Sequence, residues 1–229
     1  MRELLPEPVV TAIQRHYERA ISAAQEGYNS SREDEDSVTG ALGQAMRRIN
    51  GRVTVDGVVY RWRTTYRKFR GRGYKAAEKL FGADGIFEIE VFDDDGNTLG
   101  RKALLFQAKN NWRGRDERLT RQASQLSGVR GAAIVVNYGS EGYTAVSAEI
   151  VAEAEGNRSR LPPEAESPLS DVIARKFVLC SIGRRDLYYD AERKLLVYLS
   201  EGQIILARRL PVRHRVRTTV GMRSRPRDR

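Results

Sequence analysis

The stretch GADGIFEIEVFDDDGNTLGRKALLFQAKNN, residues 82–111, decides the fold. Within residues 86–92, Phe87, Ile89 and Val91 alternate with charged residues, which is typical of a strand with one buried face. The Asp, Gly and Asn residues at 93–97 favour a turn, because these residue types tolerate positive φ. A second alternating strand is predicted from about Arg101, so the stretch should form an antiparallel hairpin.

The second strand ends in polar side chains where a buried strand should end in core residues. Gln107 and Lys109 fall on one face of this strand, and Asp84 begins its partner. In an antiparallel hairpin the start of one strand lies beside the end of the other. A carboxylate, an amide oxygen and an ammonium group converging there could hold a hard divalent cation and position a water. The structural alternative is a solvated strand end with an ordinary salt bridge.

The order of these motifs resembles a known family. Gly-x-Asp-Gly, a hairpin, and then Gln-x-Lys followed by Asn resemble the PD-(D/E)XK nuclease superfamily, in particular its Mrr-like branch, where Gln replaces the acid of the third motif. The resemblance covers roughly residues 30–150. It implies an α/β, restriction-endonuclease-like fold, with a mixed central sheet flanked by helices. It also implies that Asp84 binds metal, Gln107 is the variant ligand and Lys109 is the catalytic lysine.

A further acid lies near the start of a helix predicted over residues 33–49. Of the four acids there, only Glu35 is in line with Val38 and Leu42 on the apolar stripe. The others suit the positive end of the helix dipole. Nucleases of this superfamily often carry an acid on the first core helix in a Glu-x-x-x-Thr-Gly-like setting. The resemblance therefore implies a metal-binding role for Glu35, with Asp36 as the fallback.

Gln122 is the last candidate for the catalytic site. It shares one face of a helix predicted over residues 115–127 with Leu119, Ala123 and Leu126, and so points inward. Members of the superfamily often have a glutamine on this helix near the active site, and Gln122 matches it. A structural glutamine with satisfied hydrogen bonds is the alternative.

Composition restricts the function classes and favours a polyanionic partner. The 229 residues carry a formal net charge of +10, which favours nucleic acid. Cys180 is the single cysteine, so the sequence excludes a disulfide framework and a cysteine-based zinc site. His16 and His214 are the only histidines and are far apart in sequence, which argues against a histidine-metal nuclease and a Ser-His-Asp hydrolase. No apolar run approaches the ~18 residues of a membrane span, and no signal peptide is evident, so a cytoplasmic protein is expected.

A second predicted hairpin, residues 52–69, has Asp56-Gly57 as its turn. Its basic residues are interleaved with aromatic ones such as Tyr60, Trp62 and Tyr66, which suits phosphate contact and base stacking. An edge strand protected by charge is the alternative. The predicted nucleic-acid contacts of the chain are Arg63, Arg67, Lys68, Arg70, Arg113 and Arg115.

The chain divides by pattern into three parts. Residues 1–156 form the nuclease-like core with an N-terminal helix, and the apolar run 131–138 is expected to be its buried central strand. Residues 157–212 are expected to be a linker followed by an α+β segment, with strands at 177–182 and 194–206, which either completes the same domain or forms an appendage. Residues 213–229 have many arginines and no periodicity that we recognise, so we expect a disordered basic tail.

These features together predict a Mg²⁺-dependent endonuclease, with Mn²⁺ as a substitute, that hydrolyses phosphodiester bonds in DNA. A restriction or phage-defence effector is one setting for such an enzyme. Gln107 removes one negative charge from the usual ligand set, so the metal should be held weakly unless Glu35 compensates. The alternatives are a catalytically inactive nucleic-acid-binding module, an effector subunit that needs a partner protein, and an RNA nuclease.

Overall fold

The predicted hairpin is confirmed as an antiparallel pair of β3 (Gly85–Phe92) and β4 (Thr98–Asn110). The computed structural model describes residues 3–69, 83–129, 131–210 and 212–223. The Asp93 carboxylate closes the turn by accepting a hydrogen bond from the Asn97 N–H at 2.7 Å. At the other end of the pair Gly85 stands opposite Phe106, and the Asp84 N–H donates to the Phe106 carbonyl at 2.9 Å. This pairing places Asp84 beside the end of β4.

The segment expected to be a disordered tail contains a central strand of the sheet, so that prediction is wrong for residues 214–223. β12 (His214–Arg223) lies between β2 (Val58–Lys68) and β3, antiparallel to the first and parallel to the second. Its alternation is masked by arginines, because Val216, Thr218 and Val220 face the core while Arg215 and Arg217 face the other side. The arginines are tolerated because acids on β3 pair with them.

Those acids overturn the expectation that β3 has only one buried face. Glu88 and Glu90 are 1% and 6% exposed. Arg215 donates to the Glu88 carboxylate and Arg217 to the Glu90 carboxylate. A buried carboxylate is costly unless a cation and hydrogen bonds compensate it, and β12 supplies both. The charged side of the period-two pattern is thus a second interior face.

The hairpin predicted over residues 52–69 is also present. β1 (Arg48–Val55) pairs antiparallel with β2 around the Asp56-Gly57 turn. Strand alternation buries Tyr60 and Trp62 on one face and exposes the arginines of β2 on the other. The buried Tyr60 and Trp62 are therefore not available for the base stacking that the sequence predicts, while phosphate contact by the exposed arginines stays a prediction.

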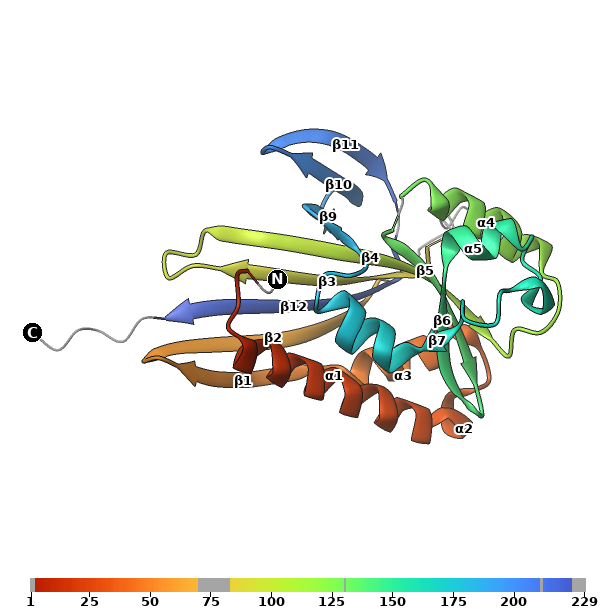
Figure 1. The fold of residues 1–229 in the computed structure, drawn as a ribbon, viewed down its shortest axis with the longest axis horizontal. Helices are drawn as coiled ribbons and strands as arrows, with labels where there is room; N and C mark the ends of the chain where they lie inside the picture. The colour runs from red at the N-terminus through yellow and green to blue at the C-terminus, as the bar shows by residue number, and fades with distance from the viewer. Residues whose placement is uncertain (1–2, 70–82, 130, 211, 224–229) are drawn as a thin grey trace, which may run out of the picture.

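Three helices lie on the face of the sheet that carries Phe87 and Leu104 (Figure 1). They are α1 (Glu7–Glu26), α2 (Tyr28–Ser31) and α3 (Glu35–Ala45). Val9, Ile13, Tyr17 and Ile21 of α1 recur at four-residue spacing and are buried against the sheet. Since α3 ends at Ala45, the prediction that it continues to Ile49 is wrong. Ile49 instead lies in β1 and is 74% exposed.

The opposite face is covered by α4 (Glu117–Ser127) and α5 (Ala148–Glu153). The apolar run predicted as a central strand is β5 (Ala133–Gly139), parallel to β4 and antiparallel to β6 (Gly142–Ser147). Val135 and Val146 from these strands pack against Leu119 of α4 and Val151 of α5. The end of β4 therefore lies between two layers of helices.

The C-terminal segment packs on the same core. The 3₁₀ turn η2 (Arg158–Arg160), β7 (Ser167–Pro168), the π-helix η3 (Asp171–Phe177) and β8 (Arg184–Arg185) lead into a second sheet. That sheet consists of β9 (Leu187–Asp190), β10 (Leu195–Ser200) and β11 (Gln203–Arg209). Turns replace the strand predicted at 177–182, and a turn at Glu201-Gly202 splits the one predicted at 194–206. Leu187 and Leu196 pack on Leu105 of β4.

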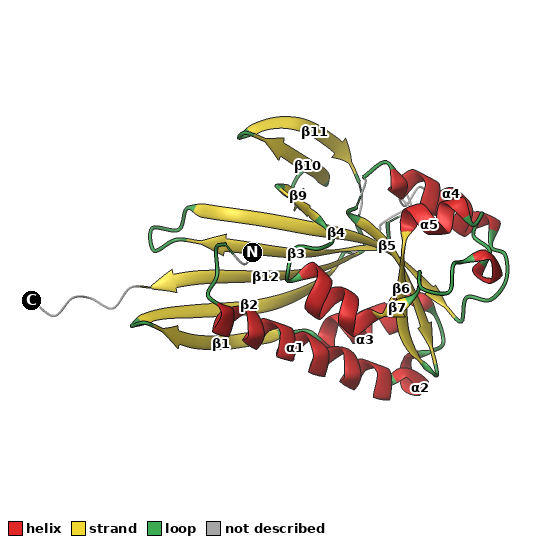
Figure 2. Cartoon of the chain, in the orientation of Figure 1, coloured by secondary structure: helices red, strands yellow, loops and turns green. Residues whose placement is uncertain are grey.

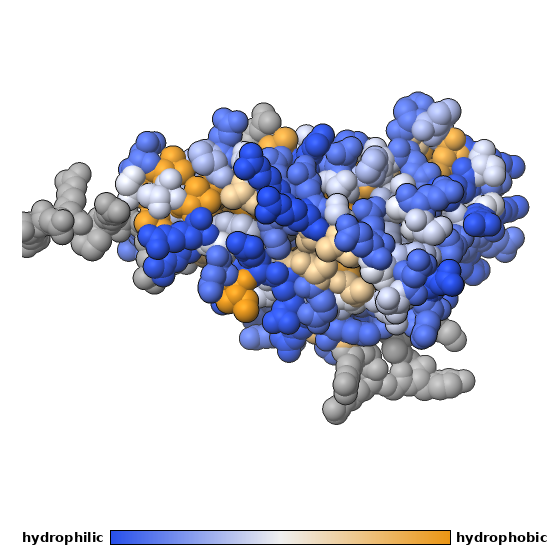
Figure 3. Space-filling view, turned by 90° about the horizontal axis from the view of Figure 1, so that it is seen from below, coloured by the Kyte–Doolittle hydropathy of each residue, from blue (hydrophilic) through white to orange (hydrophobic). Residues whose placement is uncertain are grey.

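The described residues thus form a mixed α/β fold with a central sheet flanked by helices (Figures 1 and 2). The strand order of the main sheet is β1-β2-β12-β3-β4-β5-β6-β7, with β8 paired to β4. Seen from below, hydrophilic residues predominate on the surface and apolar ones form small patches between them (Figure 3). Among the described helices, none has the length and apolar character needed to cross a membrane.

Candidate active site

Asp84 and Gln107 meet across the hairpin at the end of β4. Asp84 Oδ2 accepts hydrogen bonds from the Gln107 side-chain amide and from the Ala108 N–H, the latter at 2.9 Å. The pairing follows from the hairpin register, which makes the two residues direct cross-strand neighbours. The prediction that Asp84 lies near Gln107 is therefore confirmed.

The environment of Asp84 is poor in water and lies close to another acid. Burial and, to a smaller extent, the nearby Glu35 carboxylate raise the pKa of Asp84, which is about 6. The Ala108 N–H, Lys109 and Arg118 oppose that rise in pKa. A carboxylate in this state gains from a further cation beside it, because the cation offsets both burial and the second acid.

Two buried amide oxygens have no hydrogen-bond partner within the described part of the chain. One is Gln107 Oε1 and the other is Gln122 Oε1 on α4. Buried polar atoms are normally paired, so each of these oxygens calls for a partner that is not a described protein group. Gln122 points inward, as predicted. The alternative of a structural glutamine with satisfied hydrogen bonds does not hold for its side-chain oxygen, which has no partner among the described residues.

Lys109 is held between two carboxylates. Its Nζ lies 2.9 Å from Asp116 Oδ2 and 3.9 Å from Glu35 Oε1, and the residue is 9% exposed. Strand alternation puts Lys109 on the same face of β4 as Gln107. The ammonium group is therefore fixed at the strand end beside Asp116 and Glu35, and it is close enough to Asp84 to lower the pKa of that carboxyl.

Glu35 reaches this site because it is the first residue of α3. Asp34 caps the helix, with Oδ1 accepting from the Ser37 N–H at 2.7 Å. Burial raises the pKa of Glu35, while Lys109 and Arg118 lower it. The neighbouring Asp36 turns away and accepts hydrogen bonds from Lys68 and His214. Of the two acids weighed from the sequence, Glu35 is thus the one beside Lys109.

Sequence reasoning missed two residues at the start of α4, namely its cap Asp116 and Arg118 in its first turn. Asp116 pairs with Lys109 and also caps α4, accepting from the Leu119 N–H at 2.8 Å. Arg118 lies close enough to lower the pKa of both Glu35 and Asp84. The sequence signal was the Asp-Glu start of this helix, which is a capping pattern with no indication of the lysine it would meet.

His214 was also missed, because it was placed in the expected tail. Its N–H and that of Arg213 both donate to the Asp84 carbonyl, at 2.9 and 3.0 Å. Its imidazole lies 2.9 Å from Asp36 and 2.8 Å from the Tyr66 hydroxyl. Burial lowers the pKa of His214 to about 4. One residue of β12 therefore contacts both the Asp84 backbone and the helix turn that carries Glu35.

The predicted nucleic-acid contacts are distributed over different surfaces. Arg63 and Arg67 are exposed on one face of β2, whereas Lys68 faces the other side and pairs with Asp36. Arg113 and Arg115 are exposed in the loop before α4, and Arg115 lies 3.9 Å from Glu155. Arg70 lies outside the described residues. The six residues therefore do not form one continuous patch.

The donor set at the strand end suits a hard cation. Across residues 3–69, 83–129, 131–210 and 212–223, no group of three or more His, Cys, Asp or Glu side chains is placed to hold a metal ion. The candidate set consists of two carboxylates, from Asp84 and Glu35, and the amide oxygen of Gln107. Mg²⁺ uses such oxygen ligands and keeps several waters, so a small set with one orphan oxygen fits it.

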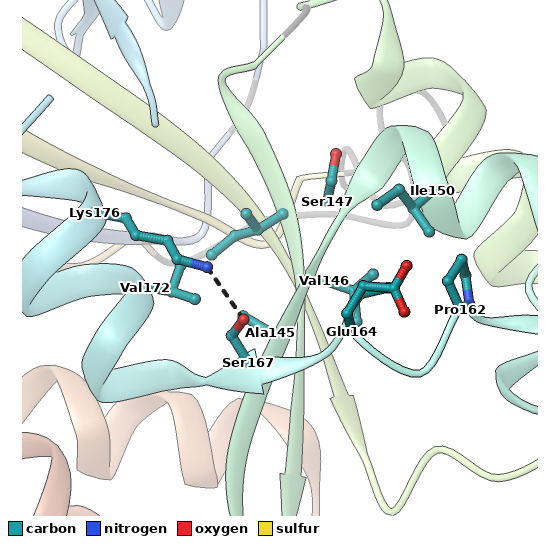
Figure 4. Close-up of a pocket in the computed structure, with 11 residues that line it drawn as sticks. Ala145, Val146, Ser147, Ile150, Pro162, Glu164, Ser167, Val172 and Lys176 are labelled. Carbon is teal, nitrogen blue, oxygen red and sulfur yellow. Dashed lines mark hydrogen bonds between the residues drawn. The ribbon is translucent and has the colours of Figure 1, made fainter. Parts of the chain in front are cut away.

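A hollow of the described surface lies away from this site. It lies between β6, α5 and η3, has a volume of about 310 Å³ and is bordered by Lys176, whose Nζ donates to Ser167 (Figure 4). None of the candidate active-site residues lines it. The candidate site at the end of β4 therefore lies outside this hollow.

No protein-family model, no curated protein and no solved structure gives a significant match to this chain.

Proposed function

We propose that this protein is a metal-dependent nuclease that hydrolyses phosphodiester bonds in DNA. The observation that carries the proposal is the partnerless Gln107 oxygen beside the Asp84 carboxylate, at a strand end where Lys109 and Glu35 also meet. A divalent cation would supply that partner and compensate the two acids at once.

Asp84, Glu35 and the Gln107 oxygen are the groups that would hold the cation. When bound, it would supply Lewis-acid charge at the scissile phosphate and help to acidify the attacking water. The Ala108 N–H fixes one oxygen of Asp84, which orients the carboxylate. Gln107 contributes no charge, so Glu35 provides the second negative charge of the set.

Lys109 has a different role in this proposal. An ammonium group has no lone pair to donate to a metal, but it stabilises negative charge that develops on phosphate oxygens. Its position is fixed by strand β4 and by the carboxylates of Asp116 and Glu35. Charge that is already in position stabilises the developing negative charge more effectively than a mobile side chain does.

The ion pair between Lys109 and Asp116 favours one rival, a nucleic-acid-binding module without catalysis. At 2.9 Å this pair occupies the ammonium group that a scissile phosphate would need. In the nuclease proposal the phosphate competes with Asp116 for Lys109. In the rival proposal Lys109 is only a structural partner of the α4 cap.

Cleavage of labelled plasmid, single-stranded DNA and RNA in Mg²⁺, Mn²⁺ or chelator separates these functions. The proposal expects cutting of DNA with metal, and loss of cutting in chelator and in Asp84→Asn. Binding without cutting under every metal condition would favour the binding module. Cutting of RNA alone would support the RNA nuclease instead. Cutting in chelator would show that cleavage does not need a metal ion.

A further inference from the structure

The strands β1, β2 and β12 expose a row of arginines on the face of the sheet opposite α1. On β2 these are Arg61, Arg63 and Arg67, which alternate with the buried Tyr60 and Trp62. Arg52 of β1 is the direct cross-strand neighbour of Arg61, so it extends the row to the edge strand. All four arginines are exposed.

The arrangement of these arginines is unfavourable for the isolated fold. Arg52 stands opposite Arg61 in one strand pair, and Arg67 stands opposite Arg215 in the next. Like charges in directly opposed positions destabilise a sheet. The charge of Arg215 is balanced by Glu88, but the opposition of Arg52 and Arg61 has no such compensation among the described residues, so the stability of the sheet does not account for it.

Neighbouring acids do not neutralise the outer part of the row. Glu88 and Glu90 are buried and are engaged by Arg215 and Arg217 of β12. Among the described residues, no ion pair to Arg52, Arg61, Arg63 or Arg67 is formed; Arg63 donates only to the Thr219 hydroxyl, at 3.4 Å. The buried pairs therefore use up the acids of this face and leave an excess of four positive charges on β1 and β2.

A cleft borders the arginines on the side of the small sheet. It has a volume of about 460 Å³ and is lined by Arg67, Arg215 and Arg217 on the main sheet and by Tyr188 of β9. Arg101 packs over the Tyr188 ring at 4.3 Å. Asp190 and Glu192 form the acidic far rim. A polyanion would therefore be repelled from β9 and directed onto β2.

We propose that this face, defined by Arg52, Arg61, Arg63 and Arg67, binds the sugar-phosphate backbone of a nucleic acid. The inference rests on the proposed nuclease function and names a surface for its substrate. A guanidinium group can form two parallel hydrogen bonds with phosphate oxygens, which the ammonium group of lysine cannot do. Arginine is therefore the better side chain for binding a sugar-phosphate backbone. The three arginines of β2 span about 20 Å of strand, the length of about six base pairs of duplex.

The register connects this face to the candidate active site. Arg67 stands opposite Arg215, and Arg215 stands opposite Ile86, two residues after Asp84. The arginine row therefore begins level with the active-site end of the sheet and runs away from it along β2. A backbone bound along the row would extend from the site where the proposal expects cleavage.

The test compares two double variants of equal charge change. Arg61→Gln with Arg63→Gln removes two guanidinium groups from the row, and Arg15→Gln with Arg19→Gln removes two exposed ones from α1. Binding of labelled duplex DNA, single-stranded DNA and RNA is measured by fluorescence anisotropy in chelator over a range of salt. For duplex DNA, the salt slope of log K should fall by about 2 in the first variant and stay unchanged in the second.

Equal salt slopes in the two variants, or no nucleic-acid binding by the wild type, would overturn the surface. The polymer that shows the largest loss identifies the form of backbone that the face binds. A wild type that binds with the expected loss but never cuts would refute the nuclease and leave the surface standing. Unchanged binding by a variant that still cuts would refute the surface alone.

Discussion

Lys109 Nζ lies 2.9 Å from Asp116 Oδ2, and the same carboxylate caps α4 through the Leu119 N–H. The lysine that the nuclease proposal makes catalytic is thereby tied to the start of the helix that carries Gln122. Any substrate phosphate that draws Lys109 away must do so against this contact. The pair is also the point at which the nuclease and the binding module differ most clearly.

Replacing Lys109 with Ala should leave metal and DNA binding in place and reduce cleavage by about two to three orders of magnitude, the usual scale for one electrostatic catalytic group. Lys109→Arg should rescue only part of the rate, because the guanidinium group is larger and planar. Single-turnover cleavage of one labelled substrate, with binding measured in Ca²⁺, gives both quantities.

The control for Lys109 is Lys176→Ala, since Lys176 is exposed and its Nζ donates only to the Ser167 hydroxyl. Lys102, at the other end of β4, is unsuitable as a control although its sequence position suggests one. Its Nζ is buried and donates to the Phe177 carbonyl at 2.6 Å. If Lys109→Ala cuts at the wild-type rate, Lys109 has no catalytic role.

Glu35→Gln should abolish cleavage and leave the fold intact, because the carboxylate faces Lys109 at 3.9 Å and is not the cap of α3. Asp36→Asn is the matched control in the same helical turn. It should keep cleavage but lower the melting temperature, since the amide carries no charge to pair with Lys68 and has one accepting oxygen in place of the two that Lys68 and His214 use. Cleavage assays and thermal denaturation of both variants check this. The reverse pattern of activities would show that Asp36 is the functional acid.

Lys102 should make stability depend on pH in the alkaline range. Burial lowers the pKa of Lys102 to about 8, with partial compensation from Cys180. The unfolded chain holds this proton until about pH 10.4, so between these values it binds more protons than the folded chain. The contribution of Lys102 to the free energy of unfolding therefore rises with pH in this window.

The measurement is urea denaturation of wild type and Lys102→Met at pH 8, 9 and 10. The difference in unfolding free energy should move in favour of the wild type by about 2 kcal/mol across that range. Repeating the pair in a Cys180→Ser background removes the neighbouring thiol as a source of the change. A difference that stays constant with pH would contradict the lowered pKa.

A chain that ends at Arg213 should fail to fold, because it lacks β12 from the middle of the sheet. Both neighbours of that strand, β2 and β3, would lose their hydrogen-bonded partner, and Glu88 and Glu90 would lose their guanidinium groups. A chain that ends at Arg223 keeps all of β12 and is the control. Circular dichroism and soluble yield distinguish the two, and a folded, soluble short chain would contradict the prediction.

The parts of the fold and site that could be predicted are those fixed by short-range pattern. The hairpin follows from alternation and a turn, and its register alone brings Asp84 to Gln107. Glu35 follows from its place on the apolar stripe of a helix. In each case the information lies within one element or between two adjacent ones, where periodicity is a reliable guide.

The parts that could not be predicted depend on partners far away in sequence. The arginines of β12 resemble a solvated tail until Glu88 and Glu90 are known to lie beside them. In the sequence Lys102 looks like an ordinary surface charge, whereas in the structure it is buried and donates to the Phe177 carbonyl. Asp116 was visible as a helix cap, but its ion pair with Lys109 depends on how α4 packs against β4. Composition and residue spacing do not show which residues far apart in the sequence come into contact.

The two buried ion pairs between β12 and β3 also fix the alignment of a strand that arrives from far along the chain. Arg215 serves Glu88 and Arg217 serves Glu90, two residues further on in each strand. A slip of one residue would turn both guanidinium groups to the other face. A slip of two that brings Arg217 to Glu88 would set Thr219 beside Glu90 and leave that acid buried without a cation, at a cost of roughly 3–5 kcal/mol. The two ion pairs thus disfavour these slipped registers, and in doing so they help to hold the Asp84 backbone, to which the His214 N–H donates, in its place.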